Sequence, residues 1–263
     1  MILFLAFLLQ PNLAHPAVSQ WTSIGPEGGN VVGLVVDPNS PNNVYANTGS
    51  KILKSTNGGG NWNLANSGLP TNLNVLVIDP NNPNSLYVGA LTGVFKSTDG
   101  GANWNPIGTG LPSGGVIELA VDPQNPATLY AGIEFGGVYR SIDGGTTWIA
   151  ANNGLPTYPD YSDPPIFYYP SIRALAIDPF NSNLIYAGAS GGEGGLFKTI
   201  NGGASWNLAD SGLPIPGLTE SWISELVIDP TNSNKVYALT GLGPYKTEWR
   251  HKLGSCKRRL ARS

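Results

Sequence analysis

The chain has 263 residues, among them 35 Gly and 22 Pro, and its side chains are 41% hydrophobic, 10% aromatic and only 12% charged. So many Gly and Pro residues exclude a helical bundle, and the apolar share is large enough for a packed core, which argues against disorder. The formal net charge is −3, and six of the 14 Lys and Arg residues lie in the last 16 positions. Residues 1–247 are therefore acidic, and we expect no nucleic-acid partner.

Residues 1–19 have the features of a signal peptide. Residues 2–9 are an uninterrupted apolar run, and small residues at positions 17 and 19 suit cleavage before Gln20. The run is too short to cross a bilayer, and no other stretch is long enough, so we expect no membrane span. The sequence thus predicts bacterial-type export, with the protein secreted, periplasmic or at the cell surface.

One unit recurs along almost the whole chain. Its first part is an apolar stretch that ends in Asp-Pro, a turn, and a stretch that contains Tyr; five copies begin at Val35, Val77, Ala120, Ala176 and Val227. Its second part is a short apolar-polar stretch, a Gly-rich turn and a Trp, and from Asp-Pro to Trp the four copies span 25, 25, 26 and 28 residues. Each unit therefore contains four short strands, which we call A to D.

Four antiparallel strands per repeat are typical of a propeller blade. The sequence predicts an all-β fold, a β-propeller of four-stranded antiparallel blades over residues 20–247, with about five blades visible. A parallel β-helix would need shorter repeats, and a sandwich would not repeat so regularly. Residues 21–26 resemble the stretch from Trp to Gly-Leu-Pro that ends each unit, so we expect an N-terminal D strand that completes the last blade of a ring.

The Gly-rich turn follows the pattern Ser-x-Asp-x-Gly-x-x-Trp, with Asn in place of Asp in the first and fourth copies. In this pattern residues 21–247 resemble the BNR or Asp-box repeat of the sialidase-like superfamily, as found in sortilin-like, xyloglucanase-like and photosystem-assembly-factor-like propellers. The resemblance implies the fold rather than an activity. The structural Asp-box residues are Ser55, Asn57, Gly59, Trp62, Ser97, Asp99, Gly101, Trp104, Ser141, Asp143, Gly145, Trp148, Thr199, Asn201, Gly203 and Trp206.

We expect these residues to build a turn, because an Asx side chain accepts backbone N–H bonds, Gly-Gly permits positive φ, and Trp packs between sheets. Asp99 and Asp143 could instead be catalytic or metal-binding carboxylates. Their repetition with Asn substitutes favours the structural interpretation, as does that of the Asp-Pro pairs. The only Cys, Cys256, and the two His residues lie in the signal and tail regions, so we expect neither a cofactor nor a metal site.

The families that the chain resembles also allow enzyme hypotheses to be compared. A sialidase requires three arginines, and only Arg140 and Arg173 precede the tail. In xyloglucanase-like hydrolases a catalytic Asp follows the Tyr-Ala-x-Thr stretch, and Gly49 occupies that position here. We therefore expect no catalytic residue. The alternative is a fragment of a glycoside hydrolase, which would show an acid pair facing a groove.

Segments that depart from the repeat are where we expect a binding site. A Tyr-rich insertion at 157–170 is flanked by the B-to-C loops 132–137 and 188–195, and a further extension follows at 215–222. Aromatic rings and acids in these loops could bind sugar faces or a peptide, or the tyrosines could merely cover the blade edge. The candidate ligand-binding residues are Tyr158, Tyr161, Phe167, Tyr168, Tyr169, Glu134, Phe135, Glu193 and Trp222.

Residues 248–263 change abruptly to a basic composition where a fifth Asp-box is due. Back-translated in a shifted frame, they can encode Asn-Gly-Gly-Thr-Ser-Trp at the spacing of the other copies. We therefore expect a frameshifted, non-native tail on a longer propeller; a functional basic tail is the alternative. The sequence as a whole predicts an exported, non-catalytic binding module for a protein or polysaccharide ligand, or else a scaffold or assembly factor with a protein partner.

Overall fold

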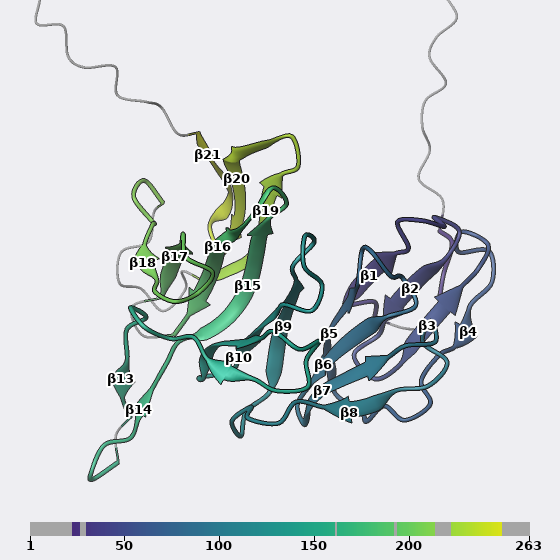
Figure 1. Cartoon of the computed structure of the whole chain (residues 1–263), viewed down its shortest axis with the longest axis horizontal. Helices are drawn as coiled ribbons and strands as arrows, with labels where there is room; N and C mark the ends of the chain where they lie inside the picture. Colours follow the sequence, from purple (N-terminus) through teal and green to yellow (C-terminus); the bar gives the residue numbers. More distant parts are fainter. Residues whose placement is uncertain (1–22, 27–29, 161, 192–193, 214–221, 249–263) are drawn as a thin grey trace, which may run out of the picture.

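The computed structural model describes residues 23–26, 30–160, 162–191, 194–213 and 222–248, and these form 21 strands and no helix. Five small antiparallel sheets follow one another around an open arc, each with its first strand on the inner side (Figure 1). The predicted all-β propeller arrangement is therefore confirmed. The predicted signal peptide and residues 249–263 of the tail lie outside the described residues.

The sheets are the blades, and each follows the predicted order A to D. Blade 1 comprises β1 (Gly33–Val36), β2 (Val44–Asn47), β3 (Ile52–Ser55) and β4 (Asn63–Leu64). Blade 2 comprises β5 (Leu73–Ile78), β6 (Leu86–Ala90), β7 (Gly93–Ser97) and β8 (Asn105–Ile107). Blade 3 comprises β9 (Val116–Val121), β10 (Leu129–Ile133), β11 (Gly137–Ser141) and β12 (Ile149–Ala150).

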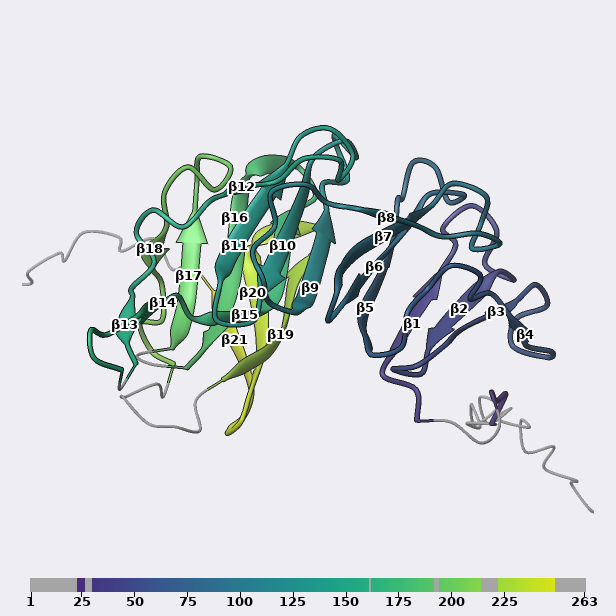
Figure 2. The same cartoon turned by 90° about the horizontal axis from the view of Figure 1, so that it is seen from below.

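Blade 4 comprises β15 (Ser171–Asp178), β16 (Asn181–Ser190), β17 (Gly195–Thr199) and β18 (Asn207–Leu208). Blade 5 has three strands among the described residues, β19 (Ile223–Asp229), β20 (Asn232–Thr240) and β21 (Gly243–Glu248). The insertion forms a separate hairpin of β13 (Tyr158–Pro159) and β14 (Phe167–Tyr168), beside blade 4 (Figure 2). The D strands begin one residue after the Trp rather than at it, because the Trp still belongs to the turn.

The core lies between successive blades. The Tyr of strand B in each of the first four blades is at most 2% exposed and faces the next blade, as Tyr45, Tyr87, Tyr130 and Tyr186 show. Its cross-strand partner on strand C is a Lys or Arg whose cation lies 5.0 to 5.8 Å from the ring centroid. The basic residue of strand C thus covers the Tyr ring.

The Asp-box turn holds itself together by two side chains. In blade 3, the Ser141 hydroxyl donates to Asp143 Oδ1 at 2.8 Å and accepts the Gly145 N–H at 2.9 Å, while Asp143 Oδ1 accepts the Thr147 N–H at 2.9 Å. Blades 1, 2 and 4 repeat these bonds, with Asn57 and Asn201 as acceptors in place of Asp. Both turn glycines have positive φ in every copy. The turn chemistry expected from the sequence is present, including where Asn replaces Asp.

Each box Trp packs against the preceding blade. Trp104 Nε1 donates to the carbonyl of Ala65, and Trp206 Nε1 to that of Ala151, in both cases the residue three positions after the preceding Trp. Trp62 Nε1 donates in the same way to Ile24, three positions after Trp21. Ile24 therefore occupies the place of a D-strand residue beside blade 1, although residues 23–26 form no strand. The expected ring closure is not seen, because blades 1 and 5 lie at opposite ends of the arc (Figure 1).

Asp143 offers a test of the turn. Asp143→Ala removes the acceptor of the Thr147 and Ser141 bonds, so we expect a lower melting temperature, by less than loss of a core Trp, and intact ligand binding. Asp143→Asn keeps the acceptor and should melt near the parent at pH 7. Hydrogen bonds from Thr147 and Ser141 lower the pKa of Asp143 from 3.8 to about 2, so its charge stabilises the fold above pH 3.8 and ceases to do so as the pH falls through 2. Thermal melts at pH 7 and pH 3 measure both effects, and an unchanged Asp143→Ala melt with lost binding would reverse the assignment.

Candidate functional site

The hairpin β13–β14 meets the B-to-C loop of blade 3. The Phe135 N–H donates to Ser171 Oγ at 2.9 Å, and the Gly137 N–H donates to the Pro170 carbonyl at 3.2 Å. The rings of Phe135 and Tyr168 meet edge to face, with centroids 6.4 Å apart. The insertion and the loop 132–137 thus lie in contact, two of the segments in which the sequence analysis expected a binding site.

The candidate aromatic residues separate into exposed and packed side chains. Phe135, Phe167, Tyr168 and Trp222 are 54%, 62%, 37% and 43% exposed. Phe135 also has a φ of 56°, a left-handed conformation that is strained for a bulky residue and common at ligand sites. These four rings can contact a ligand without rearrangement of the core.

Two other candidates pack into the structure. Tyr169 is partly buried against the core between blades 3 and 4, so it covers the blade edge, as the alternative hypothesis held. Tyr158 is half-buried, its hydroxyl has no hydrogen-bond partner within the described part of the chain, and burial raises its pKa to about 12. Glu134 is half-buried beside Gly115. Tyr161 and Glu193 lie outside the described residues.

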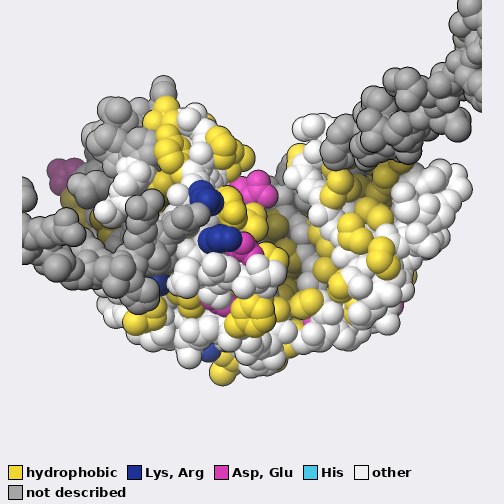
Figure 3. Space-filling model, turned by 90° about the horizontal axis from the view of Figure 1, so that it is seen from above, with side chains coloured by type: hydrophobic (Ala, Val, Ile, Leu, Met, Phe, Trp, Pro, Cys, Tyr) yellow, Lys and Arg dark blue, Asp and Glu magenta, His cyan; other side chains and the backbone are white. Residues whose placement is uncertain are grey.

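A pocket of about 560 Å³ opens between the first strands of blades 3, 4 and 5. Two exposed aromatic side chains, an arginine and three serines line it, together with an isoleucine and a glycine. These residues are Phe135, Trp222, Arg173, Ser171, Ser190, Ser224, Ile117 and Gly191. Arg173 Nε donates to Ser190 Oγ at 2.8 Å, which holds the guanidinium at the rim. In Figure 3, charged side chains of both signs lie beside the hollow inside the arc.

β-bulges place the polar and apolar lining of this pocket. The first strands of blades 3, 4 and 5 each carry one extra residue at the same register position, and these residues are Ile117, Arg173 and Ser224. A bulge turns its extra side chain away from the regular alternation of the strand. All three line the pocket, so the bulges of successive blades supply its inner wall.

Two acids that the sequence analysis did not single out lie one position after the bulges of blades 3 and 5. The pKa of Glu118 is raised to about 8, mainly by burial and then by the charge of Glu225. Glu118 is half-buried and Glu225 is exposed. Glu118 is therefore largely protonated at neutral pH. The signal that could have found both is an acid inside an otherwise apolar strand, four residues before Asp-Pro.

The described residues contain no group of three or more His, Cys, Asp or Glu side chains that could hold a metal ion. Nor does the described part of the chain include an apolar helix of membrane-spanning length.

No protein-family model and no curated protein matches the chain. Among solved structures it is similar to an ancestral GH74 enzyme, with a TM-score of 0.60 and 24% identity over 85% of this chain and 29% of that one. It is also similar to the extracellular domain of a one-component system from B. thetaiotaomicron (TM-score 0.53, 16% identity, 87% and 35% covered). The GH74 xyloglucanase from Xanthomonas campestris aligns with a TM-score of 0.49 and 20% identity over 82% and 44% of the two chains.

The chain thus spans less than half the length of each of these proteins. At 24% and 16% identity, the likeness to the ancestral GH74 enzyme and to the extracellular domain shows the fold alone: the chain is a β-propeller of small antiparallel blades that resembles part of longer propellers.

Proposed function

We propose that this chain is an exported, non-catalytic β-propeller that binds a polysaccharide in the pocket between the first strands of blades 3, 4 and 5. The observation that carries the proposal is the pairing of the exposed rings of Phe135 and Trp222 with hydroxyl and guanidinium groups around one pocket. Sugar rings present apolar faces and a rim of hydroxyls, so aromatic faces and polar side chains together suit them. The hairpin ring of Tyr168, in contact with Phe135, extends the same surface.

The binding test removes the rings one at a time. We expect Phe135→Ala and Trp222→Ala each to weaken polysaccharide binding about tenfold or more, because each deletes a stacking anchor of about 1 to 2 kcal/mol. Tyr168→Ala, and Phe167→Ala beyond it on the hairpin, should weaken binding less. Binding is measured on a glycan array and by affinity electrophoresis in gels that contain soluble polysaccharides, including xyloglucan.

Phe180→Ala is the matched control, since Phe180 is a 64% exposed Phe in the turn between β15 and β16 and does not line the pocket. It should bind as the parent does, and circular dichroism should show all variants folded. Equal binding by the parent and both pocket variants would refute this site. A protein captured in pull-downs, together with no polysaccharide retained, would favour the scaffold or assembly-factor alternative.

A second candidate function is glycoside hydrolysis, and Glu118 with Glu225 is the observation that favours it. A carboxylic acid that stays protonated at neutral pH, with a second carboxyl group acting on it, is the combination that such hydrolysis uses. Release of reducing ends from a polysaccharide, abolished in both Glu118→Gln and Glu225→Gln, would establish this function. Binding without release supports the non-catalytic proposal.

A further inference from the structure

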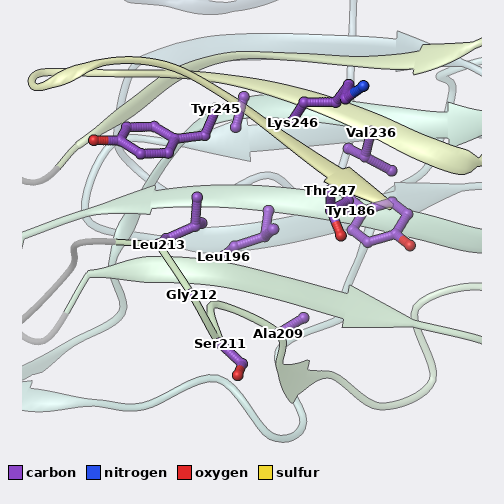
Figure 4. Close-up of a pocket in the computed structure, with 11 residues that line it drawn as sticks. Tyr186, Leu196, Ala209, Ser211, Gly212, Leu213, Val236, Tyr245, Lys246 and Thr247 are labelled. Carbon is purple, nitrogen blue, oxygen red and sulfur yellow. The ribbon is translucent and has the colours of Figure 1, made fainter. Parts of the chain in front are cut away.

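A second cavity, of about 290 Å³, lies between blades 4 and 5 (Figure 4). Its walls come from the strands of both blades and from the turn after β18, and include Tyr186, Leu196, Ala209, Gly212, Leu213 and Tyr245. None of these residues belongs to the pocket of the proposed function. The other junctions between blades show which side chain fills the equivalent space.

At the junctions between blades 1 and 2 and between blades 3 and 4, the equivalent space holds the box Trp of the following blade. Trp104 is 3% exposed in the core formed with Tyr45 and Ala65, and its indole N–H donates to the Ala65 carbonyl. Tyr186 and Ala209 hold the same repeat positions as Tyr45 and Ala65. The cavity is therefore a tryptophan socket, and blade 5 supplies no Asp-box Trp to it among the described residues.

Gly212 gives independent evidence that the socket is empty. Its equivalents Gly68, Gly110 and Gly154 have φ values of 91°, 94° and 88°, and a Cβ on any of them would collide with the backbone carbonyl of the neighbouring box Trp. Gly212 has the same φ of 91°, yet a Cβ there would meet nothing within 4 Å. The chain retains the turn that receives a Trp backbone, and no Trp backbone of the described residues fills it.

The hydroxyl of Tyr186 gives the third observation. Tyr45 and Tyr130 donate their hydroxyls to the carbonyls of Gly100 and Gly202, the first glycine of the next blade's box, at 3.1 and 2.9 Å. Tyr186 is 2% exposed, and its hydroxyl has no hydrogen-bond partner among the described residues. A buried donor without a partner destabilises the fold, so this hydroxyl marks the place of an absent carbonyl.

We propose that this cavity is a binding site for a polypeptide turn of the type Asx-Gly-Gly-x-x-Trp, which joins blade 5 from the end of β21. The Trp fills the cavity, its indole N–H donates to the Ala209 carbonyl, and the first Gly carbonyl accepts the Tyr186 hydroxyl. In every complete box the Trp follows the strand-C Ser or Thr by seven residues, which places it at position 254, where this sequence has Gly254. Residues 248–263 contain no Asx-Gly-Gly, so the proposed occupant is a turn that these residues do not encode.

The decisive experiment is a graft. Residues 248–261 are replaced by a copy of residues 200–213, which carry the blade 4 turn and follow Thr199 as the graft follows Thr247. We expect the melting temperature to rise by about 6 °C or more over the same graft with Ala in place of its Trp, because a buried Trp adds several kcal/mol to a domain of this size. Equal melting temperatures for the two grafts would overturn the proposal.

Tyr186→Phe distinguishes a filled socket from general stabilisation. In the parent it should leave the melting temperature unchanged or raise it, since it removes an unpaired donor; in the graft it should lower it. Tyr130→Phe is the matched control and should lower the melting temperature in both, because Tyr130 already donates to Gly202. If Tyr186→Phe has the same effect in parent and graft, the assignment of its hydroxyl is wrong.

A measurement in trans decides the matter if the graft does not fold. A fluorescent peptide that copies residues 200–213 is titrated with the full chain, beside the same peptide with Ala in place of Trp. We expect the Trp peptide to bind at least tenfold more tightly, and Tyr186→Phe to reduce that difference. No difference between the two peptides would also overturn the proposal.

Discussion

Trp148→Ala is expected to lower the free energy of unfolding by about 3 to 5 kcal/mol, the range for removing a large aromatic side chain from a packed core. Trp148 is 3% exposed and packs with Tyr87, Leu119 and Leu129 in the core between blades 2 and 3. Its indole N–H donates to the Gly145 carbonyl at 2.8 Å, within its own turn rather than to the preceding blade. The substitution therefore empties a core site and frees a buried carbonyl.

Trp62→Ala is the matched control for this prediction. Trp62 holds the same position in the blade 1 turn but is only half-buried, and its indole N–H donates to the Ile24 carbonyl. Its removal should cost clearly less than that of Trp148. Urea denaturation followed by circular dichroism gives the free energies, with the m-value as a check that the denatured state is unchanged. Similar losses for the two variants would contradict the view that blade-to-blade packing carries the stability.

The fold could be predicted from the sequence because its signals are local and repeated. The Asp-Pro turn and the Asp-box turn each complete their hydrogen bonds within a few residues, as Asp37 with Asn39 and Asp143 with Thr147 illustrate. Each copy of the repeat therefore predicts the same local structure, and the spacing between copies predicts the blade boundaries. The Trp of each Asp-box also indicated packing between successive sheets.

The candidate site was only partly predictable, since its inner wall depends on register. Phe135 and Trp222 lie in segments that depart from the repeat, and the aromatic and acidic residues of these segments made both residues candidates. Arg173 and Ser224 line the pocket because a bulge shifts each of them out of the strand's alternation. A bulge arises from the pairing of two strands, so it cannot be predicted from the order of apolar and polar residues in one strand.

Glu118→Gln is expected to abolish a fall in stability between about pH 4.5 and pH 8. The pKa of Glu118 is raised from 4.5 to about 8 in the folded chain, first by burial and then by Glu225. Between these values the unfolded chain has lost the proton and the folded chain retains it, so raising the pH favours unfolding. The slope is up to about 1.4 kcal/mol per pH unit, an upper bound because Glu118 keeps part of its surface in water.

Gln keeps the shape and hydrogen-bonding capacity of the protonated acid and never ionises, so Glu118→Gln should match the parent near pH 5 and exceed it in stability by a growing margin up to pH 8. Glu225→Gln is the companion variant: it leaves Glu118 buried and removes only the neighbouring charge, so the parent's decline with pH should persist and end at a lower pH. Urea denaturation at intervals from pH 4.5 to pH 9 measures all three profiles. Parallel profiles for the parent and Glu118→Gln would mean that Glu118 ionises in the folded chain as it does in water. In that case Glu118, the residue after the pocket-lining Ile117, would carry a full charge at neutral pH, and the hydrolase alternative would lose its proton donor.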